Sequence, residues 1–135
     1  MRLLCELRSG GVRNVSAAID LLRTSVFSAL TGARAGNRDV AIIFLHGASA
    51  DMAATMRAAS AARRDGITLL AVGVTANVRM RELDAIASYP MKSNVFRIPN
   101  YYSFVNIQGG LTRAVCNGLF IGLITSRFPS FIMRC

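Results

Sequence analysis

The fold of this chain is decided by residues 58–74, AASAARRDGITLLAVGV. The alanine-rich first part completes a helical pattern over residues 51–64, whose predicted apolar face consists of Met52, Met56, Ala59 and Ala62. Asp65-Gly66 is a typical C-terminal stop for such a helix. Residues 67–74 are apolar without alternation, as in a strand that helices cover on both faces. The stretch therefore predicts a helix, a tight turn and a buried strand.

The same alternation of helix and strand continues on both sides. Upstream, residues 14–30 have a helical apolar stripe that Asn14 caps, and residues 40–45, VAIIFL, predict a second buried strand. Downstream, we expect a short helix over residues 81–88 and a third strand over residues 94–98. A last helix is indicated by apolar residues at helical spacing and weakened by Gly109-Gly110; these residues are Phe104, Ile107, Leu111 and Val115.

This order of elements predicts an α/β fold with a Rossmann-like, three-layer parallel sheet and helices on both faces. Only three strands are evident, whereas a doubly wound sheet normally has about five or six. One strand, most simply the first, should therefore have an unpaired edge. The length of 135 residues allows one domain, which we place at residues 1–116. Residues 117–135 then form an unrelated, apolar C-terminal tail.

The charge balance is strongly basic, with 16 basic residues against 7 acidic ones and a net charge of +9. Every basic residue except Lys92 is an arginine, and only Arg63 and Arg64 are adjacent. Scattered arginines without interleaved aromatic residues are typical of solvated surface charge. Nonspecific binding of nucleic acid or another polyanion by a basic half-Rossmann chain is the alternative function, and it predicts an affinity that falls steeply with salt.

The cysteines and the apolar segments exclude further classes of protein. Cys5, Cys116 and Cys135 form neither a CxxC motif nor a Cys/His cluster, so no zinc or redox site is indicated. The sequence leaves open whether Cys116 is free or bonded to one of the others. Charges near the N-terminus interrupt any signal peptide. The apolar stretch 119–133 contains Gly122, Arg127 and Pro129, so we expect no membrane span.

Four segments together carry a family resemblance. They are residues 40–47, VAIIFLHG; residues 58–74; residues 81–96, RELDAIASYPMKSNVF; and Gly10-Gly11 followed by Ala17-Ala18-Ile19. These segments resemble the central strand, the D-G-I turn with its FAVGV strand, the RELEEIAS motif and the GG.TNT entry of the von Willebrand factor A (vWA) domain. Residues 107–111 and 113–116 also resemble the closing helix of that domain and its cysteine. The resemblance is to the extracellular-matrix branch of this family, which includes type VI collagen and matrilins. The resemblance spans roughly Leu7 to Cys116 and implies a domain truncated in its N-terminal half.

The resemblance implies a module that binds proteins, often through a divalent metal held by a D-x-S-x-S loop, a threonine and an aspartate. This chain lacks the D-x-S-x-S segment, Arg13 is the likeliest counterpart of the threonine, and His46 replaces the aspartate. Mg²⁺ requires several hard oxygen ligands, which the hydroxyls of Ser49 and Thr75 alone do not supply. We therefore expect a degenerate adhesion site with no metal and no cofactor.

The resulting interpretation is a non-enzymatic interaction or adhesion module, extracellular by family resemblance, with a protein ligand such as a matrix component. The sequence shows neither a phosphate-binding loop nor a nucleophile beside a base, so it does not indicate an enzyme or a small-molecule substrate. In the family, ligands approach the loops that follow the strands, so the candidate binding residues here are Arg13, Asn14, His46, Ser49, Thr75 and Arg79. Arg13 and Arg79 offer positive charge to an acidic partner. A third possibility is that half a sheet does not fold alone.

Overall fold

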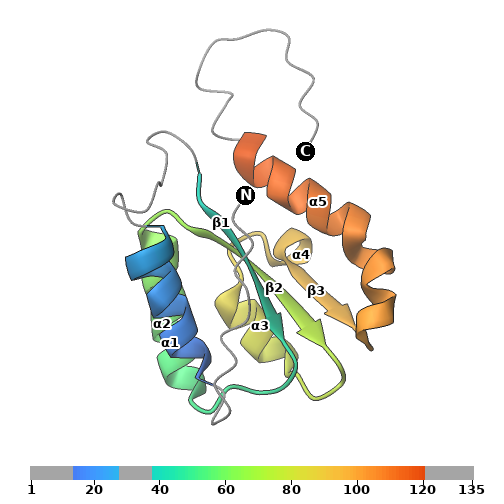
Figure 1. Cartoon of the computed structure of the whole chain (residues 1–135), viewed down its shortest axis with the longest axis horizontal. Helices are drawn as coiled ribbons and strands as arrows, with labels where there is room; N and C mark the ends of the chain where they lie inside the picture. Colours follow the sequence, from blue (N-terminus) through green and yellow to red (C-terminus); the bar gives the residue numbers. More distant parts are fainter. Residues whose placement is uncertain (1–13, 28–37, 121–135) are drawn as a thin grey trace, which may run out of the picture.

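The computed structural model describes residues 14–27 and 38–120 and has the predicted α/β architecture (Figure 1). In chain order the elements are α1 (Val15–Leu21), the π-helical segment η1 (Leu22–Val26), β1 (Val40–Leu45), α2 (Met52–Arg64), β2 (Thr68–Val74), α3 (Met80–Ile86), α4 (Met91–Asn94), β3 (Val95–Ile98), the 3-10 turn η3 (Tyr101–Phe104) and α5 (Val105–Phe120). The end of the first predicted helix, residues 28–30, lies outside the described residues. The domain boundary expected after residue 116 falls within α5 and stays a prediction.

The strands form one parallel sheet in the order β1-β2-β3. Val40 pairs with Thr68 at the start of β1, and Val74 pairs with Ile98 at the end of β2. Because β2 is central, all its residues except Thr68 are buried, as its unbroken apolar sequence predicts. In the described part of the chain β1 has a neighbour on one side only, which confirms the unpaired edge. The expected burial of β1 on both faces is wrong at Phe44, which is 47% exposed.

Helices α1, α2 and α3 cover one face of the sheet, and α5 covers the other (Figure 1). The first core lies between helices α1, α2 and α3 and the side of β1 and β2 that carries the odd-numbered residues. Its members include Ile19, Ala59, Ala62, Leu83 and Ile86 from the helices and Ala41, Leu45, Leu69 and Ala71 from the strands. The second core packs Leu111 and Ala114 of α5 on Leu70, Val72, Val74 and Ile98. The three layers confirm the predicted arrangement of helices on both faces.

Helix α5 passes close to β3 at Gly110. A Cβ atom built there would lie 3.0 Å from the Cε1 atom of Phe96, whereas one built at Gly109 would meet nothing within 4 Å. The glycine pair was expected to weaken this helix, yet α5 continues through both positions. A glycine at position 110 therefore allows the close approach of helix and strand.

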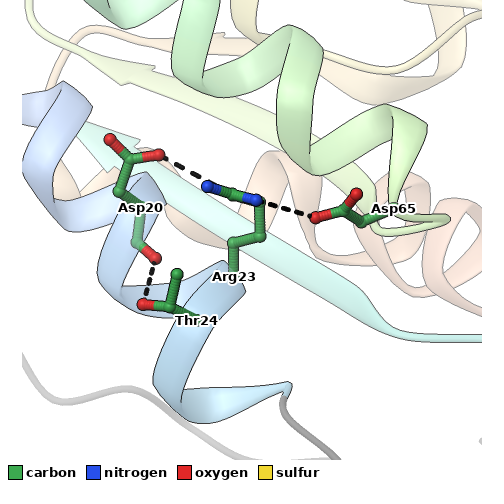
Figure 2. Close-up of polar contacts among 4 residues, drawn as sticks. All are labelled: Asp20, Arg23, Thr24 and Asp65. Atoms are coloured by element: carbon green, nitrogen blue, oxygen red, sulfur yellow. Dashed lines mark hydrogen bonds and ion pairs between the residues drawn. The ribbon is translucent and has the colours of Figure 1, made fainter.

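The first helix changes from α to π geometry at Leu22. Figure 2 shows the side-chain contacts of Arg23 and Thr24 in this segment. The Thr24 hydroxyl donates to the Asp20 carbonyl at 2.8 Å, in competition with the backbone N–H that would bond there in an α-helix. Arg23 Nη1 donates to Asp65 Oδ2 at 3.1 Å, and this ion pair ties the first helix to the end of α2.

Local signals explain where helices start and stop. Asn14 and Asp51 cap α1 and α2 as predicted, because their side chains accept hydrogen bonds from Ala17 N and Ala54 N. The turn after α2 needs glycine, since Gly66 has φ 87°.

Two features differ from the sequence-based expectation. Met56 is 46% exposed and does not belong to the core. The buried face of α2 keeps the predicted Ala59 and Ala62, but its other members are Thr55 and Ala58. The short helix α4, which follows a cis Tyr89–Pro90 bond, was not expected. It directly precedes β3 and shortens that strand to four residues.

Candidate functional site

The loops that follow β1 and β2 lie together at the carboxyl edge of the sheet. Parallel strands end at the same edge, and in open α/β sheets ligands bind there. The Thr75 hydroxyl donates to the His46 carbonyl at 3.3 Å and also accepts from Asn77 N at 3.4 Å. Two of the predicted loops are thus joined through two of the predicted residues.

His46 is exposed, and its ring is stacked on an aromatic side chain. The ring centroids of His46 and Tyr101 are 6.3 Å apart with an interplanar angle of 7°. Two residues earlier on β1, Phe44 contacts Phe104 with centroids 6.1 Å apart. The exposed rings extend onto η3, where Tyr101 is 59% and Tyr102 is 95% exposed. Residues His46, Tyr101 and Tyr102 form what we call the aromatic rim.

The loop after β1 is fixed to the first turn of α3 by a buried carboxylate. Glu82 is only 2% exposed, and its Oε1 accepts a hydrogen bond from the Ser49 backbone N–H at 2.8 Å. The Ser49 hydroxyl is also buried, and it has no partner among the described residues. The loop after β1 is therefore held at Ser49, through its backbone, by a residue of α3.

A hollow of about 410 Å³ opens beside Thr75. It is lined by Thr75, Ala76, Arg97, Ile98 and Pro99, from the ends of β2 and β3. Thr75 has φ 84°, a left-handed conformation that is uncommon for a β-branched residue, and its N–H donates to the Ile98 carbonyl at 2.9 Å. The guanidinium of Arg97 donates from Nη2 to the Ala76 carbonyl at 3.2 Å. The loop and the arginine side chain therefore hold each other in place.

The remaining predicted residues are less closely connected to this edge. Arg79 is exposed at the start of α3 and makes no capping hydrogen bond with its side chain. Asn14 is engaged as the cap of α1. Arg13 lies outside the described residues. The structure thus joins His46 to Thr75, and it adds three residues that sequence reasoning missed, Glu82, Arg97 and Tyr101.

The described residues offer recognition groups rather than a set of metal or catalytic ligands. Among them, no three His, Cys, Asp or Glu side chains come together. Cys116, near the end of α5, is disulfide-bonded, and the other cysteines of the sequence, Cys5 and Cys135, lie outside the described residues. None of the described helices has the length and the apolar character that crossing a bilayer requires.

Comparison with known proteins connects this architecture to matrix proteins. The chain is 29% identical over 117 residues to the mouse collagen alpha-5(VI) chain. This match covers 85% of this chain and 4% of the collagen. It is 32% identical over 112 residues to the collagen alpha-1(XII) chain of the newt Notophthalmus viridescens, covering 82% of this chain and 12% of that protein. The chain therefore spans a small fraction of the curated relatives it matches.

Solved structures have the same fold at lower sequence identity. Proximal thread matrix protein 1 from the mussel byssus superposes with a TM-score of 0.74 at 20% identity, over 83% of this chain and 28% of that one. Manganese-loaded Plasmodium vivax TRAP protein superposes with a TM-score of 0.57 at 12% identity, over 75% of this chain and 41% of that one. The profile of the von Willebrand factor type A domain matches residues 2–110. The parallel sheet, the relatives and this match agree, and the chain belongs to the von Willebrand factor type A domain family.

Proposed function

We propose that this chain is a non-enzymatic module that binds an extracellular-matrix protein through the carboxyl-edge loops, without a metal ion. The observation that carries the proposal is the joining of the two loops by Thr75 beside the exposed His46–Tyr101 stack. Aromatic and arginine side chains are enriched at protein interfaces, and rigid loops on a packed sheet present them at little entropic cost. The candidate binding residues are those predicted from the sequence, Arg13, Asn14, His46, Ser49, Thr75 and Arg79.

The donor groups at this edge do not fit a magnesium site. Each described carboxylate beside the loops already has a structural role: Asp51 accepts from Ala54 N at 2.9 Å, and Glu82 accepts from Ser49 N at 2.8 Å. The Thr75 hydroxyl is engaged by two backbone groups. His46 offers nitrogen where Mg²⁺ prefers oxygen. This donor set supports adhesion that does not depend on a divalent cation.

Two further observations support the location and the absence of catalysis. The relatives are collagen chains, and Cys116 is disulfide-bonded, which favours an oxidising, extracellular environment. In the described part of the chain, the imidazole of His46 has a stacking partner and no hydrogen bond to a nucleophile or a carboxylate. A lone histidine of this kind does not satisfy the requirements of acid–base or nucleophilic catalysis.

The binding proposal is tested by biolayer interferometry of the 135-residue chain on immobilised collagen, fibronectin and laminin. The triple variant Arg13→Ala, His46→Ala, Thr75→Ala removes the side chains of three of the residues that the sequence predicts to bind. The matched control replaces three exposed residues by alanine: Arg64 on α2, and Asn106 and Thr112 on α5. We expect the first variant alone to lose binding to whichever matrix protein is bound. Binding that survives it, or no binding to any of the three, overturns this assignment.

Metal dependence and the polyanion alternative have separate readouts. A cooperative thermal melt that is the same with millimolar Mg²⁺ and with chelator is expected, and a melting temperature raised by Mg²⁺ overturns metal-independent adhesion. The absence of a cooperative transition means that the chain does not fold alone. The net charge of +9 favours polyanion binding as the second candidate. Tight binding to heparin or duplex DNA that falls steeply with salt, without binding to a matrix protein, selects that alternative.

A further inference from the structure

The hollow at the ends of β2 and β3 combines one cation with apolar walls. Of its apolar lining residues, Ile98 is buried, and Ala76 and Pro99 are exposed. The polar groups of Thr75 are already committed, since its N–H donates to Ile98 and its hydroxyl bonds to His46 and Asn77. Arg97 is therefore the residue of this lining whose side chain retains hydrogen-bond donors for a ligand.

Arg97 is oriented but not neutralised. One of its five N–H donors is used by the Ala76 carbonyl at 3.2 Å, which fixes the guanidinium against the loop. Among the described residues, the ion pairs are those of Arg23, and Arg97 has no carboxylate partner. A guanidinium held in place loses less entropy when a ligand binds, and its planar fork matches a carboxylate through two parallel hydrogen bonds.

The rest of the lining selects among anions. A phosphate group carries more charge and more acceptor oxygens than one guanidinium and three apolar walls can satisfy. A carboxylate at the end of a short aliphatic side chain fits better, because its methylene groups can contact Ala76 and Pro99, which are exposed, while its oxygens meet Arg97. The aromatic rim begins at Tyr101, two residues beyond Pro99, and offers a surface for the residues that flank the acidic side chain.

We propose that this hollow binds an aspartate or glutamate side chain of the partner protein, with Arg97 as its bidentate donor. The inference rests on the proposed binding function of the carboxyl edge and adds the chemistry of the partner. Arg97 then provides the positive charge that recognises the acidic residue, and no cation from solution is needed.

The test uses two small probes that differ by one functional group, N-acetylglutamic acid amide and its neutral isostere N-acetylglutamine amide. Each is titrated into the folded chain while amide NMR signals are recorded. We expect the acid to shift the signals of Thr75, Ala76 and Ile98 saturably, at millimolar concentration, and the neutral probe to leave them unchanged. Equal shifts with both probes, or no shifts with the acid, overturn the proposal.

Variants separate this site from general charge attraction. Arg97→Met and the control Arg64→Met both lower the net charge by one, but Arg64 lies on the far end of α2. We expect Arg97→Met to weaken binding of the acid about tenfold or more, since a hydrogen bond to a charged group contributes about 1.5–3 kcal/mol, and Arg64→Met to have no effect. Arg97→Lys, which keeps the charge, should lose part of the affinity because it loses the fork. Equal weakening by both methionine variants overturns the assignment.

The matrix-protein assay separates a failure of the proposed function from a failure of the carboxylate site. If the Arg13, His46 and Thr75 triple variant abolishes binding to the matrix protein and Arg97→Met leaves it intact, the proposed function stands and the carboxylate site is wrong. If Arg97 binds the acidic probe and no matrix protein is bound, the proposed function is wrong while the hollow still recognises carboxylates.

Discussion

Alanine substitutions at the two neighbouring glycines of α5 should have different effects on stability. Both replacements relieve the helix of a residue that costs about 1 kcal/mol relative to alanine. A Cβ at position 109 meets nothing within 4 Å. We therefore expect Gly109→Ala to raise the free energy of unfolding by about 0.5–1 kcal/mol.

At Gly110 the same gain is opposed by a steric contact. The new methyl group would lie 3.0 Å from Phe96 Cε1. That is about 0.5 Å inside the favourable separation of two carbon atoms. The Phe96 ring packs between α5 and β3, so either the ring or the helix has to move. Overpacking of this kind typically costs about 1–3 kcal/mol. The net change expected for Gly110→Ala is between about zero and a loss of about 2 kcal/mol.

Urea unfolding followed by far-UV circular dichroism measures both changes. The double variant Gly110→Ala, Phe96→Leu is the control, because a smaller side chain on β3 should restore part of the lost stability. Equal stabilisation by both alanines would show that α5 does not approach β3 as closely as described. A loss of stability in Gly109→Ala would contradict a continuous helix at that position.

Three further changes test other contacts. Glu82→Ala should lower the free energy of unfolding by about 2 kcal/mol, because the buried Ser49 N–H loses a charged acceptor. Glu82→Gln keeps an acceptor and should cost less. Hydrogen exchange at the Ser49 amide should accelerate in the alanine variant only. Arg23→Ala should cost less than about 1 kcal/mol, since its pair with Asp65 is partly exposed, and the loss should shrink when urea unfolding is repeated at high salt; a loss that is independent of salt would argue against an ionic contribution. Burial raises the pKa of the Asp39 carboxyl in the folded chain, so stability falls as pH rises from the ordinary value of 3.8 through the raised pKa. Asp39→Asn should remove this penalty, with a gain below about 0.5 kcal/mol at neutral pH and none in acid, and a gain that persists in acid melts would exclude this cause.

The local elements were largely predictable because their signals are short-range. An unbroken apolar run marks β2, and the caps at Asn14 and Asp51 and the turn at Gly66 follow from the preferences of single residues. Exposure was harder to predict, because the alanines of α2 set its buried face and leave Met56 in solvent. Helix α4 has only four residues, too few for a periodic pattern.

The site depended on contacts between distant parts of the chain. His46 and Thr75 could be placed at one edge because parallel strands end together. The stacking of His46 on Tyr101 could not, since it requires the path of the chain from β3 through η3. A glutamate in the first turn of a helix is usually solvated, so the burial of Glu82 beneath the loop at Ser49 had no signal in the sequence. Arg97 was one of many scattered arginines until the hollow beside it was known.

The two outer strands of the sheet would behave differently toward a second copy of the chain. The Thr68 N–H bonds to the Asp39 carbonyl, and backbone groups alternate in direction along a strand, so the N–H and C=O groups of Val40, Ile42 and Phe44 point away from β2. This edge has six uncharged residues, whereas β3 has four, with an exposed Arg97 among them and Pro99 just beyond. Among the described residues β1 forms the unprotected edge, and contact through it uses this edge on both copies. Association should therefore stop at a closed, two-fold pair rather than continue into fibres.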